Sequence, residues 1–259
     1  MSPDPDLAPA GPEPACAPRP IAELAARAPA GGPAHGLAVR RMFDRISTTY
    51  DLLNRLLSAG TDRRWRERTL NVLGQHAPDG PVLDSCAGTL DLAAGIARRW
   101  PQRPLVAGDF ARAMLVAGRD KLPGGAHALM FDAMRLPFAD AVFAGMTCGF
   151  GMRNLADPVR GVVEARRVLV PGGVFVVLEF FRPTRPATQL FHALYGRVVL
   201  PLVGKLVSGD GEAYAYLSRS MRGFLTRAEF EAALRSAGFR EVGAVDLTFG
   251  IASLVWGVK

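Results

Sequence analysis

The chain has 259 residues, enough for one large α/β domain or two small ones. Hydrophobic residues make up 49% of the sequence and charged residues 21%, which is ordinary for a globular protein. The net charge of +7 is compatible with nucleic acid, an anionic membrane surface or an acidic cofactor. No basic stripe interleaved with aromatic residues and no nucleic-acid motif is present, so we expect no nucleic-acid partner.

Residues 1–36 differ in composition from the rest. They hold nine of the twenty prolines, many alanines and no apolar periodicity. Such a segment cannot bury enough apolar surface to offset its ordering entropy. It also lacks the basic start and apolar core of a secretory signal. We therefore predict a disordered tail at 1–36 and one folded domain at 37–259.

Cysteine and histidine usage argues against a metal site. The three cysteines and four histidines are scattered, and no pair has metal-ligand spacing. An odd cysteine count also argues against a disulfide framework and fits the reducing cytoplasm. The longest apolar segment, 187–207, is interrupted by Gln189, His192, Arg197 and Lys205, so it is a poor candidate for a membrane span.

In chain order, the periodicity predicts helices at 40–58 and 62–74, and then strands alternating with helices. Residues 183–222 contain no strand pattern and are predicted to form a helical insertion. The predicted strands are 81–84, 105–109, 126–131, 141–148, 174–179, 240–247 and 250–258; the remaining predicted helices are 92–100, 111–121, 157–170 and 226–237.

This order predicts the fold class. Short apolar strands alternating with longer helices indicate an α/β protein with a Rossmann-like, seven-stranded, mostly parallel sheet and helices on both faces. The last two strands are joined by a short link at Phe249-Gly250, so the last strand is expected to be antiparallel.

Two features lie where a Rossmann-like sheet binds its ligand. A turn of small residues, Ala87-Gly88-Thr89, follows the first strand, and Asp109 ends the second strand. Small residues let the backbone approach a ligand, and a carboxylate can accept both hydroxyls of a ribose. A simple strand-to-helix turn with a surface aspartate is the alternative. The glycine pattern of nicotinamide sites is absent, so a cofactor without a pyrophosphate fits this loop better.

Longer motifs carry a family resemblance. From Met42 to the C-terminus, about four-fifths of the chain resembles the UbiE/MenG family, the C-methyltransferases of ubiquinone and menaquinone biosynthesis. The matching motifs are Tyr50-Asp51-Leu52-Leu53-Asn54, Leu136-Pro137-Phe138-Ala139-Asp140, Phe150-Gly151-Met152-Arg153-Asn154, Arg167-Val168-Leu169-Val170-Pro171-Gly172-Gly173, Leu178-Glu179-Phe180, Ser208-Gly209-Asp210 and Glu212-Ala213-Tyr214-Ala215-Tyr216-Leu217.

The resemblance implies S-adenosylmethionine as the cofactor. Asp109 would then hold the ribose, and Asp132 with Ala133 the adenine end. Thr89 would contact the cofactor from the loop. Asp84 and Gly88 would shape the methionine end of the pocket.

The expected reaction is C-methylation of a polyprenylated quinol ring, for either menaquinone or ubiquinone. We expect Arg153 and Asn154 to face the ring from the end of the fourth strand. Arg153 would stabilise the developing phenolate or orient a water that accepts the proton. The alternative is a structural pair between Arg153 and a carboxylate such as Asp157. Tyr50, with Asp51 beside it, is expected to close over the cofactor.

The chain departs from the family pattern at several positions. Leu90 replaces the last glycine of the cofactor loop, where it would be strained at positive φ and could crowd the cofactor. Asp62 replaces a histidine, and Gly149 lies where relatives often have a cofactor-contacting serine. Val170 and Phe181 replace a lysine and a serine at positions where the changes look benign.

The insertion at 183–222 is the expected substrate cover. An apolar groove suits a polyprenyl tail, and basic flanks suit delivery from a bilayer. We therefore expect a cytoplasmic enzyme that touches the inner face of the membrane transiently; simple packing on the sheet is the alternative. The apolar residues concerned are Leu190, Phe191, Leu194, Tyr195, Val198, Val199, Leu200, Leu202 and Val203, and the basic ones Arg182, Arg185, Arg197 and Lys205.

Two other functions remain open at the level of sequence. One is a diverged methyltransferase that acts on another small phenolic metabolite. The other is a non-catalytic binding protein with this fold, its cofactor site spoiled by Leu90. The sequence does not decide the oligomeric state.

Overall fold

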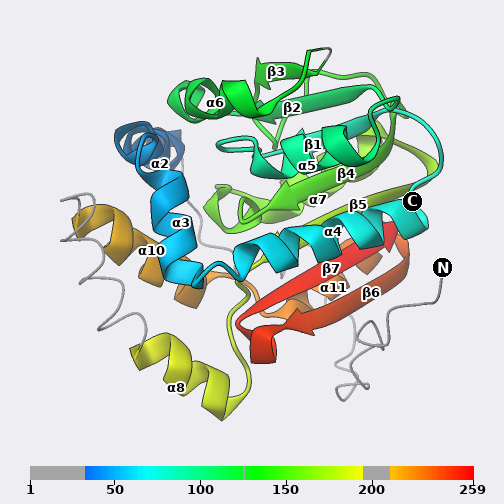
Figure 1. Cartoon of the computed structure of the whole chain (residues 1–259). Coiled ribbons are helices and arrows are strands. Elements are labelled where there is room, and N and C mark those ends of the chain that lie inside the picture. The colour runs from blue at the N-terminus through cyan, green and yellow to red at the C-terminus, as the bar shows by residue number, and fades with distance from the viewer. Residues whose placement is uncertain (1–32, 125, 195–210) are drawn as a thin grey trace.

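The computed structural model of the chain describes residues 33–124, 126–194 and 211–259. This part contains a seven-stranded sheet in the order β3-β2-β1-β4-β5-β7-β6 (Figure 1). The strands are β1 (Val82–Ser85), β2 (Leu105–Asp109), β3 (His127–Met130), β4 (Phe143–Gly149), β5 (Leu169–Glu179), β6 (Arg240–Leu247) and β7 (Ala252–Val258).

The strand directions confirm the predicted fold class. Strands β1 to β5 pair in parallel with one another, whereas β7 is antiparallel to both β5 and β6. Strand β5 begins five residues before the predicted 174–179. Its extension is held at both sides, because Leu169 pairs with Phe143 and the Gly172 N–H donates to the Lys259 carbonyl.

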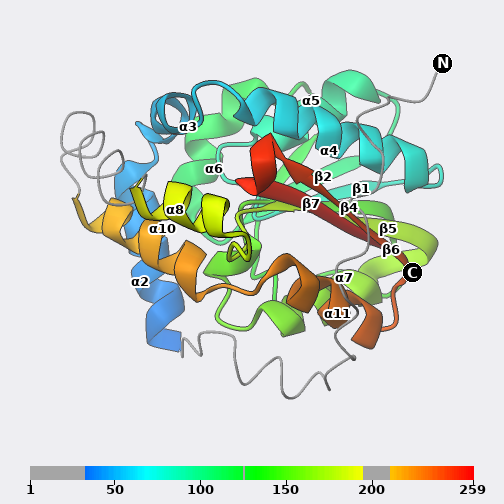
Figure 2. The ribbon, with the colours of Figure 1, turned by 90° about the horizontal axis from the view of Figure 1, so that it is seen from below.

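Helices cover both faces of the sheet (Figure 2). Helices α4 (Asp62–His76) and α5 (Asp91–Arg99) lie on one face, and α7 (Pro158–Val168) and α11 (Arg227–Ser236) on the other. Successive residues of β5 divide between these layers. Val174, Val176 and Leu178 pack on the α4–α5 side, and Phe175 and Val177 on the other. A strand that is apolar on both faces therefore occupies the centre of the sheet.

The N-terminal part forms two helices where one was predicted. Helices α2 (Pro33–Ile46) and α3 (Tyr50–Ser58) are separated by a turn, so the single helix at 40–58 was wrong. Hydroxyl groups explain the break, because Ser47 donates to the Asp44 carbonyl and Thr49 to that of Ile46. Helix α2 also overlaps the last four residues of the predicted tail.

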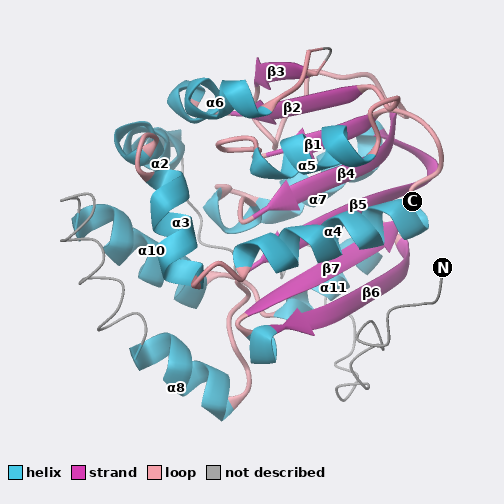
Figure 3. Cartoon of the chain, viewed as in Figure 1, coloured by secondary structure: helices cyan, strands magenta, loops and turns pink. Residues whose placement is uncertain are grey.

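The described parts of the predicted cover are helical. They are α8 (Pro186–Leu194) and α10 (Gly211–Gly223). Together with α2 and α3, these helices gather at one end of the sheet, beyond the carboxyl ends of the parallel strands (Figures 1 and 3). Eight residues that were expected in the cover lie outside the described residues: Tyr195, Arg197, Val198, Val199, Leu200, Leu202, Val203 and Lys205.

Candidate active site

Four of the six residues predicted for the cofactor meet at the carboxyl ends of the parallel strands, where open α/β sheets bind ligands: Asp84, Gly88, Thr89 and Asp109. Two small crevices of about 40 Å³ each lie here. Gly88 and Gly149 line both of them. We call these the cofactor crevices. One is bordered by Asp109 and the other by Asp84, Thr89 and Asp91.

The loop after β1 takes a strained backbone path. Cys86, Gly88 and Leu90 have φ values of 54°, 52° and 67°, the left-handed region that favours glycine. Leu90 is the first residue before α5, and its side chain is fully buried in the core between α4 and α5. The expected strain at Leu90 is therefore present. The expectation that its side chain crowds the cofactor is wrong, because it points into the core.

Asp109 fixes the loop to the end of β2. Its two carboxylate oxygens accept the backbone N–H groups of Gly88, at 3.0 Å, and Ala111, at 2.8 Å. Burial raises the pKa of Asp109, and these N–H donors act in the opposite direction. The carboxylate borders its crevice from a fixed position, which suits the predicted contact with a ribose.

Asp84 is the more unusual carboxylate. Its Oδ1 accepts the Thr147 hydroxyl at 2.6 Å, whereas its buried Oδ2 has no partner among the described residues. Burial raises the pKa of Asp84 to about 7, with a smaller contribution from the Asp109 charge. A buried carboxylate oxygen without a partner, beside a glycine turn, fits a ligand that carries an ammonium group.

Asp132 and Ala133 lie apart from these crevices. Asp132 is exposed, and its Oδ1 accepts the backbone N–H of Met134. Ala133 is buried in the core with Phe131. Neither residue borders a crevice found among the described residues, so their contact with the adenine end stays a prediction.

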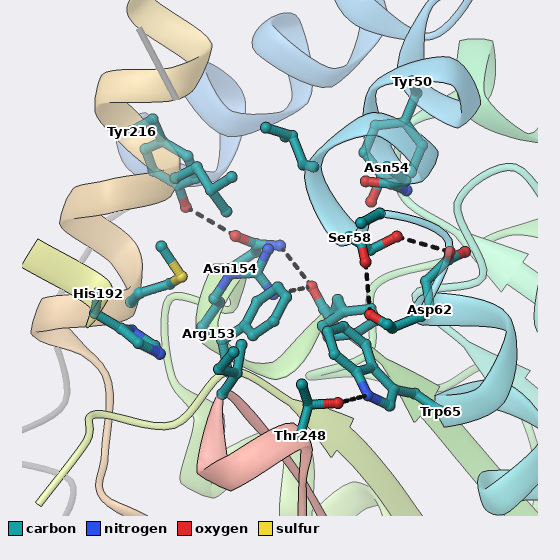
Figure 4. Close-up of a pocket in the computed structure, with 18 of the residues that line it drawn as sticks. Tyr50, Asn54, Ser58, Asp62, Trp65, Arg153, Asn154, His192, Tyr216 and Thr248 are labelled. Atoms are coloured by element: carbon teal, nitrogen blue, oxygen red, sulfur yellow. Dashed lines mark hydrogen bonds between the residues drawn. The ribbon is translucent and has the colours of Figure 1, made fainter. Parts of the chain in front are cut away.

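A much larger cavity of about 400 Å³ adjoins the crevices (Figure 4). Its wall is mainly apolar and is built by α2, α3, the start of α4, α8, α10, the segments that follow β4 and β5, and the link between β6 and β7. Tyr50 and Phe150 border this cavity and both crevices, so they lie between the large cavity and the cofactor crevices. Its other apolar and aromatic lining residues are Met42, Phe43, Ile46, Leu57, Trp65, Phe180, Phe191, Leu217, Met221 and Ile251.

Arg153 borders the large cavity and forms a buried ion pair. Its Nη1 donates to the Oε1 of Glu179 at 2.6 Å and also to the Phe150 carbonyl. Arg153 is 6% exposed and Glu179 not at all. Burial raises the pKa of Glu179, and the Arg153 charge opposes that shift. The alternative expectation, that Arg153 forms a structural pair with a carboxylate, is therefore confirmed, but the partner is Glu179. Asp157, named as the example, instead caps α7 by accepting the Arg160 N–H.

Sequence reasoning missed Glu179 as the partner of Arg153, although an acidic residue at the end of an apolar strand was a usable signal. Glu179 Oε2 also accepts the backbone N–H of Arg153, and Oε1 that of Phe180. Both carboxylate oxygens are therefore used to hold the segment that carries Arg153. Asn154, the next residue, donates to the Phe150 carbonyl and accepts from the hydroxyl of Tyr216.

Helix α3 is tied to the cofactor loop by a group of charged and polar contacts. Asp51 accepts the Thr89 hydroxyl and pairs with Lys121, which also pairs with Asp91. We call Asp51, Thr89, Lys121 and Asp91 the Asp51 network. Tyr50, on the same helix, borders both crevices, and its closure over the cofactor stays a prediction.

The structure also locates three of the other residues that depart from the family pattern. Asp62 is buried at the cavity wall, where its carboxylate accepts Ser58 and pairs with Arg66 (Figure 4). A side chain at Gly149 would have ordinary contact with Leu92, so this position leaves room in the crevices. Phe181 is buried in the core and stacks on Phe224.

Comparison with known proteins decides the family. A model described as the ubiE/COQ5 methyltransferase family matches residues 33–259. The chain belongs to this family. It is an S-adenosylmethionine-dependent methyltransferase, and the cofactor crevices provide the glycine turn and carboxylates expected for that cofactor. Within the described residues, there is no cluster of side chains that could hold a metal ion.

Relatives with the same domain extent support the assignment. The chain is 40% identical over 230 residues to the ubiquinone/menaquinone biosynthesis C-methyltransferase UbiE of Geobacter sulfurreducens, covering 86% of this chain and 89% of the relative. It is 44% identical over 230 residues to the demethylmenaquinone methyltransferase of Deinococcus radiodurans, covering 86% and 93%.

Solved structures confirm the fold at lower identity. A SAM-dependent methyltransferase of Thermotoga maritima superposes with a TM-score of 0.61 at 19% identity, covering 85% of this chain and 99% of the other. One from Aquifex aeolicus gives a TM-score of 0.53 at 16% identity, covering 74% and 88%. The described helices include none with the length and apolar character needed to cross a bilayer.

Proposed function

We propose that this chain methylates a ring carbon of a polyprenylated quinol, in the synthesis of menaquinone, ubiquinone or both. The relatives named above support this reaction class. The observation that carries the proposal is the large apolar cavity beside the cofactor crevices, with Tyr50 and Phe150 at their common wall. An apolar cavity with a few polar groups suits a lipophilic ring that must be oriented.

The bound cofactor supplies an activated methyl group. The protein must place the nucleophilic ring carbon in line with that methyl and keep water away. Tyr50 and Phe150 can hold the flat ring at the boundary between the two spaces. Asn154 borders both the large cavity and one crevice, so its amide lies close to the place where the bond forms.

Arg153 carries the positive charge that the developing phenolate requires. Its guanidinium is held by Glu179 and the Phe150 carbonyl, and its buried Nε has no partner among the described residues. An arginine remains protonated, so Arg153 is not the base. Its fixed N–H donors can stabilise the phenolate that develops as the ring attacks, or orient a water that takes the proton.

The same proposal includes a transient contact with the membrane surface. Leu190 and Leu194 of α8 are more than half exposed, and Phe249 is 91% exposed. Thr188 of α8 donates to the Phe249 carbonyl, so these residues lie on neighbouring elements. Arg182 and Arg185 are half-exposed nearby. Apolar side chains flanked by arginines suit an anionic bilayer from which a polyprenyl substrate can enter.

The reaction is tested with purified full-length protein and S-adenosylmethionine labelled at the methyl group. The acceptors are a naphthoquinol and a benzoquinol, each with one short prenyl chain and kept reduced. We expect label on a ring carbon of at least one of them. Label on oxygen, or no transfer to either while a simple phenol is methylated, would overturn the proposal.

Arg153→Ala tests the site within the same assay. Turnover should fall about 100-fold or more, because one fixed charge donor is typically worth that much in a desolvated site. Cofactor affinity, measured by calorimetry, should stay nearly unchanged. Arg153→Lys is the matched control for the buried charge, since it leaves Glu179 with a cationic partner. Unchanged turnover in Arg153→Ala would remove this residue from the mechanism.

A further inference from the structure

Two free thiols meet at the cofactor crevices. Cys86 is half-buried in the loop after β1, and Cys148 is buried in β4. They are far apart in the sequence, but β1 and β4 pair in parallel, and Cys148 lies beside Ser85, the residue before Cys86. A Cβ atom at Gly151 would lie 2.8 Å from the Cys86 sulfur and 3.0 Å from the Cys148 sulfur. Both sulfurs therefore pack against the same backbone position.

The two thiols also contact each other. A hydrogen bond with Cys86, together with burial, raises the pKa of Cys148. Neighbouring strands lie about 4.7–4.9 Å apart, and the Cα atoms joined by a disulfide are usually about 4.4–6.8 Å apart. The pair is therefore within reach of a disulfide bond without rearrangement of the sheet.

Cys86 is the thiol that a reagent can reach. It borders both cofactor crevices, whereas Cys148 borders neither and is 1% exposed. The crevices measure about 40 Å³ each, so a reagent that enters them must be hardly larger than water, whose share of the liquid volume is about 30 Å³. Hydrogen peroxide is an oxidant of this size.

We propose that Cys86 and Cys148 are a redox site at which hydrogen peroxide forms a reversible disulfide, and that this disulfide weakens cofactor binding. The Cys86 sulfur attacks one peroxide oxygen, which gives a sulfenic acid and releases water. The Cys148 sulfur then displaces the hydroxyl group as a second water while the S–S bond forms. The two thiols lose two electrons and two protons, and the peroxide is reduced to two waters. The inference concerns the cofactor site and does not depend on the quinol substrate.

The loop that carries Cys86 also frames the cofactor crevices. Bond formation brings the two sulfurs to about 2.05 Å, much closer than a hydrogen-bonded contact. Cys148 is held by the pairing of β4 with β1 and β5, so Cys86 must make the larger movement. Gly88, two residues further on, is fixed by its N–H bond to Asp109. A displaced Cys86 therefore pulls the glycine turn away from Asp109 and distorts the crevices.

The test oxidises full-length protein with hydrogen peroxide and then removes the excess. Mass spectrometry of unreduced peptides should show the disulfide between Cys86 and Cys148. Calorimetry should show at least tenfold weaker binding of S-adenosylhomocysteine, and dithiothreitol should restore the affinity. Cys16→Ser removes the third cysteine of the chain and should behave like the wild type in both measurements.

Cys148→Ala separates the roles of the two thiols. Without Cys148, oxidised Cys86 remains a sulfenic acid, so dimedone should label Cys86 in this variant at least tenfold more than in the wild type. Thermal melting shows whether the variant is folded. Equal labelling of Cys86 in the folded variant and the wild type would show that Cys148 does not resolve the sulfenic acid, and would overturn the inference.

Linkage gives a reading that needs no variant. If the disulfide weakens binding tenfold, saturating S-adenosylhomocysteine must make that disulfide easier to reduce by the same factor. Its reduction potential should then rise by about 30 mV, measured by equilibration in mixtures of reduced and oxidised dithiothreitol. A disulfide that does not form, or one that leaves the affinity unchanged and whose potential the ligand does not move, overturns the inference.

Discussion

Leu90 combines a strained backbone with a well-packed side chain. Its left-handed conformation costs about 1–2 kcal/mol, whereas a buried leucine side chain contributes about 2–5 kcal/mol. We therefore expect Leu90→Gly to lower the free energy of unfolding by roughly 1–4 kcal/mol. Cofactor affinity should change less than about threefold, because the backbone already has the path that glycine would take. A tenfold gain in affinity on calorimetry would contradict this account.

Asp84 should couple cofactor binding to a proton. Its folded pKa of about 7 lies above the unfolded value near 3.8, so folding of the ligand-free protein favours the protonated form. That contribution to stability is complete below pH 3.8 and is lost as the pH rises through 7. A bound ammonium group lowers the pKa again, so binding at pH 7 should release roughly half a proton.

Calorimetry in two buffers of different ionisation enthalpy measures this release. The apparent binding enthalpy of S-adenosylmethionine should differ between the buffers at pH 7 and agree at pH 9, where Asp84 is already ionised. Asp84→Asn should remove the difference. Equal enthalpies in both buffers for the wild type at pH 7 would show that Asp84 does not change its protonation on binding.

At the scale of single residues, the sequence patterns predicted which residues gather at the site better than they predicted which side chains pair with each other. Asp84, Gly88, Thr89 and Asp109 gather as predicted, because strand ends and turns fix their positions. The pairing of Arg153 with Glu179 joins residues 26 apart through two strands, and no local pattern specifies it.

Helix α3 borders the cofactor crevices through Tyr50. At about 40 Å³ each, the crevices are smaller than the 300–1,000 Å³ of typical small-molecule pockets, so we expect α3 to move when the cofactor enters. The Asp51 network opposes that movement. Its ion pairs are about one-third exposed, and such pairs are worth about 1 kcal/mol at most.

We therefore expect Asp51→Asn to raise the association rate constant of S-adenosylmethionine about two- to fivefold. Stopped-flow quenching of tryptophan fluorescence measures this rate. Added salt should accelerate the wild type and have less effect on the variant, because it screens the same pairs. Asp79→Asn, which removes an equal charge from a surface pair with Arg103, should leave the rate unchanged. An identical rate in Asp51→Asn would show that the network is not the barrier.

Element boundaries were predictable where periodicity and turn residues agreed. The strands around Asp84 and Asp109, and the proline-started helix α7, lie within two residues of their predicted ends. The break between α2 and α3 was missed because apolar periodicity continues through it. The hydroxyls of Ser47 and Thr49 end the helix by a local competition for carbonyl groups that periodicity does not report.

On the scale of the whole molecule, a net positive charge accompanies exposed apolar residues on α8 and on the link between β6 and β7. The net charge is +7, and the acidic N-terminal segment leaves the remainder more basic still. Phe249 is held outward by a hairpin link in which Thr248, Phe249 and Gly250 all have positive φ. The link between β6 and β7 lies beside α8 (Figure 2), and the Phe249 carbonyl accepts the Thr188 hydroxyl of that helix. Thr248 of the link and Phe191 of α8 both border the large cavity.

Vesicle sedimentation tests whether this face binds a membrane. The wild type should bind vesicles rich in phosphatidylglycerol more than vesicles of phosphatidylcholine, and added salt should weaken the difference. Inserting a phenylalanine and a leucine is worth about 1.5–3 kcal/mol each, so Phe249→Ser combined with Leu190→Ser should reduce binding at least tenfold. Val163→Ser combined with Val116→Ser removes exposed apolar side chains from α7 and from α6 (Arg112–Gly118) and should have little effect. A wild type that ignores anionic vesicles, or an equal loss in both double variants, would show that this face does not dock on a bilayer.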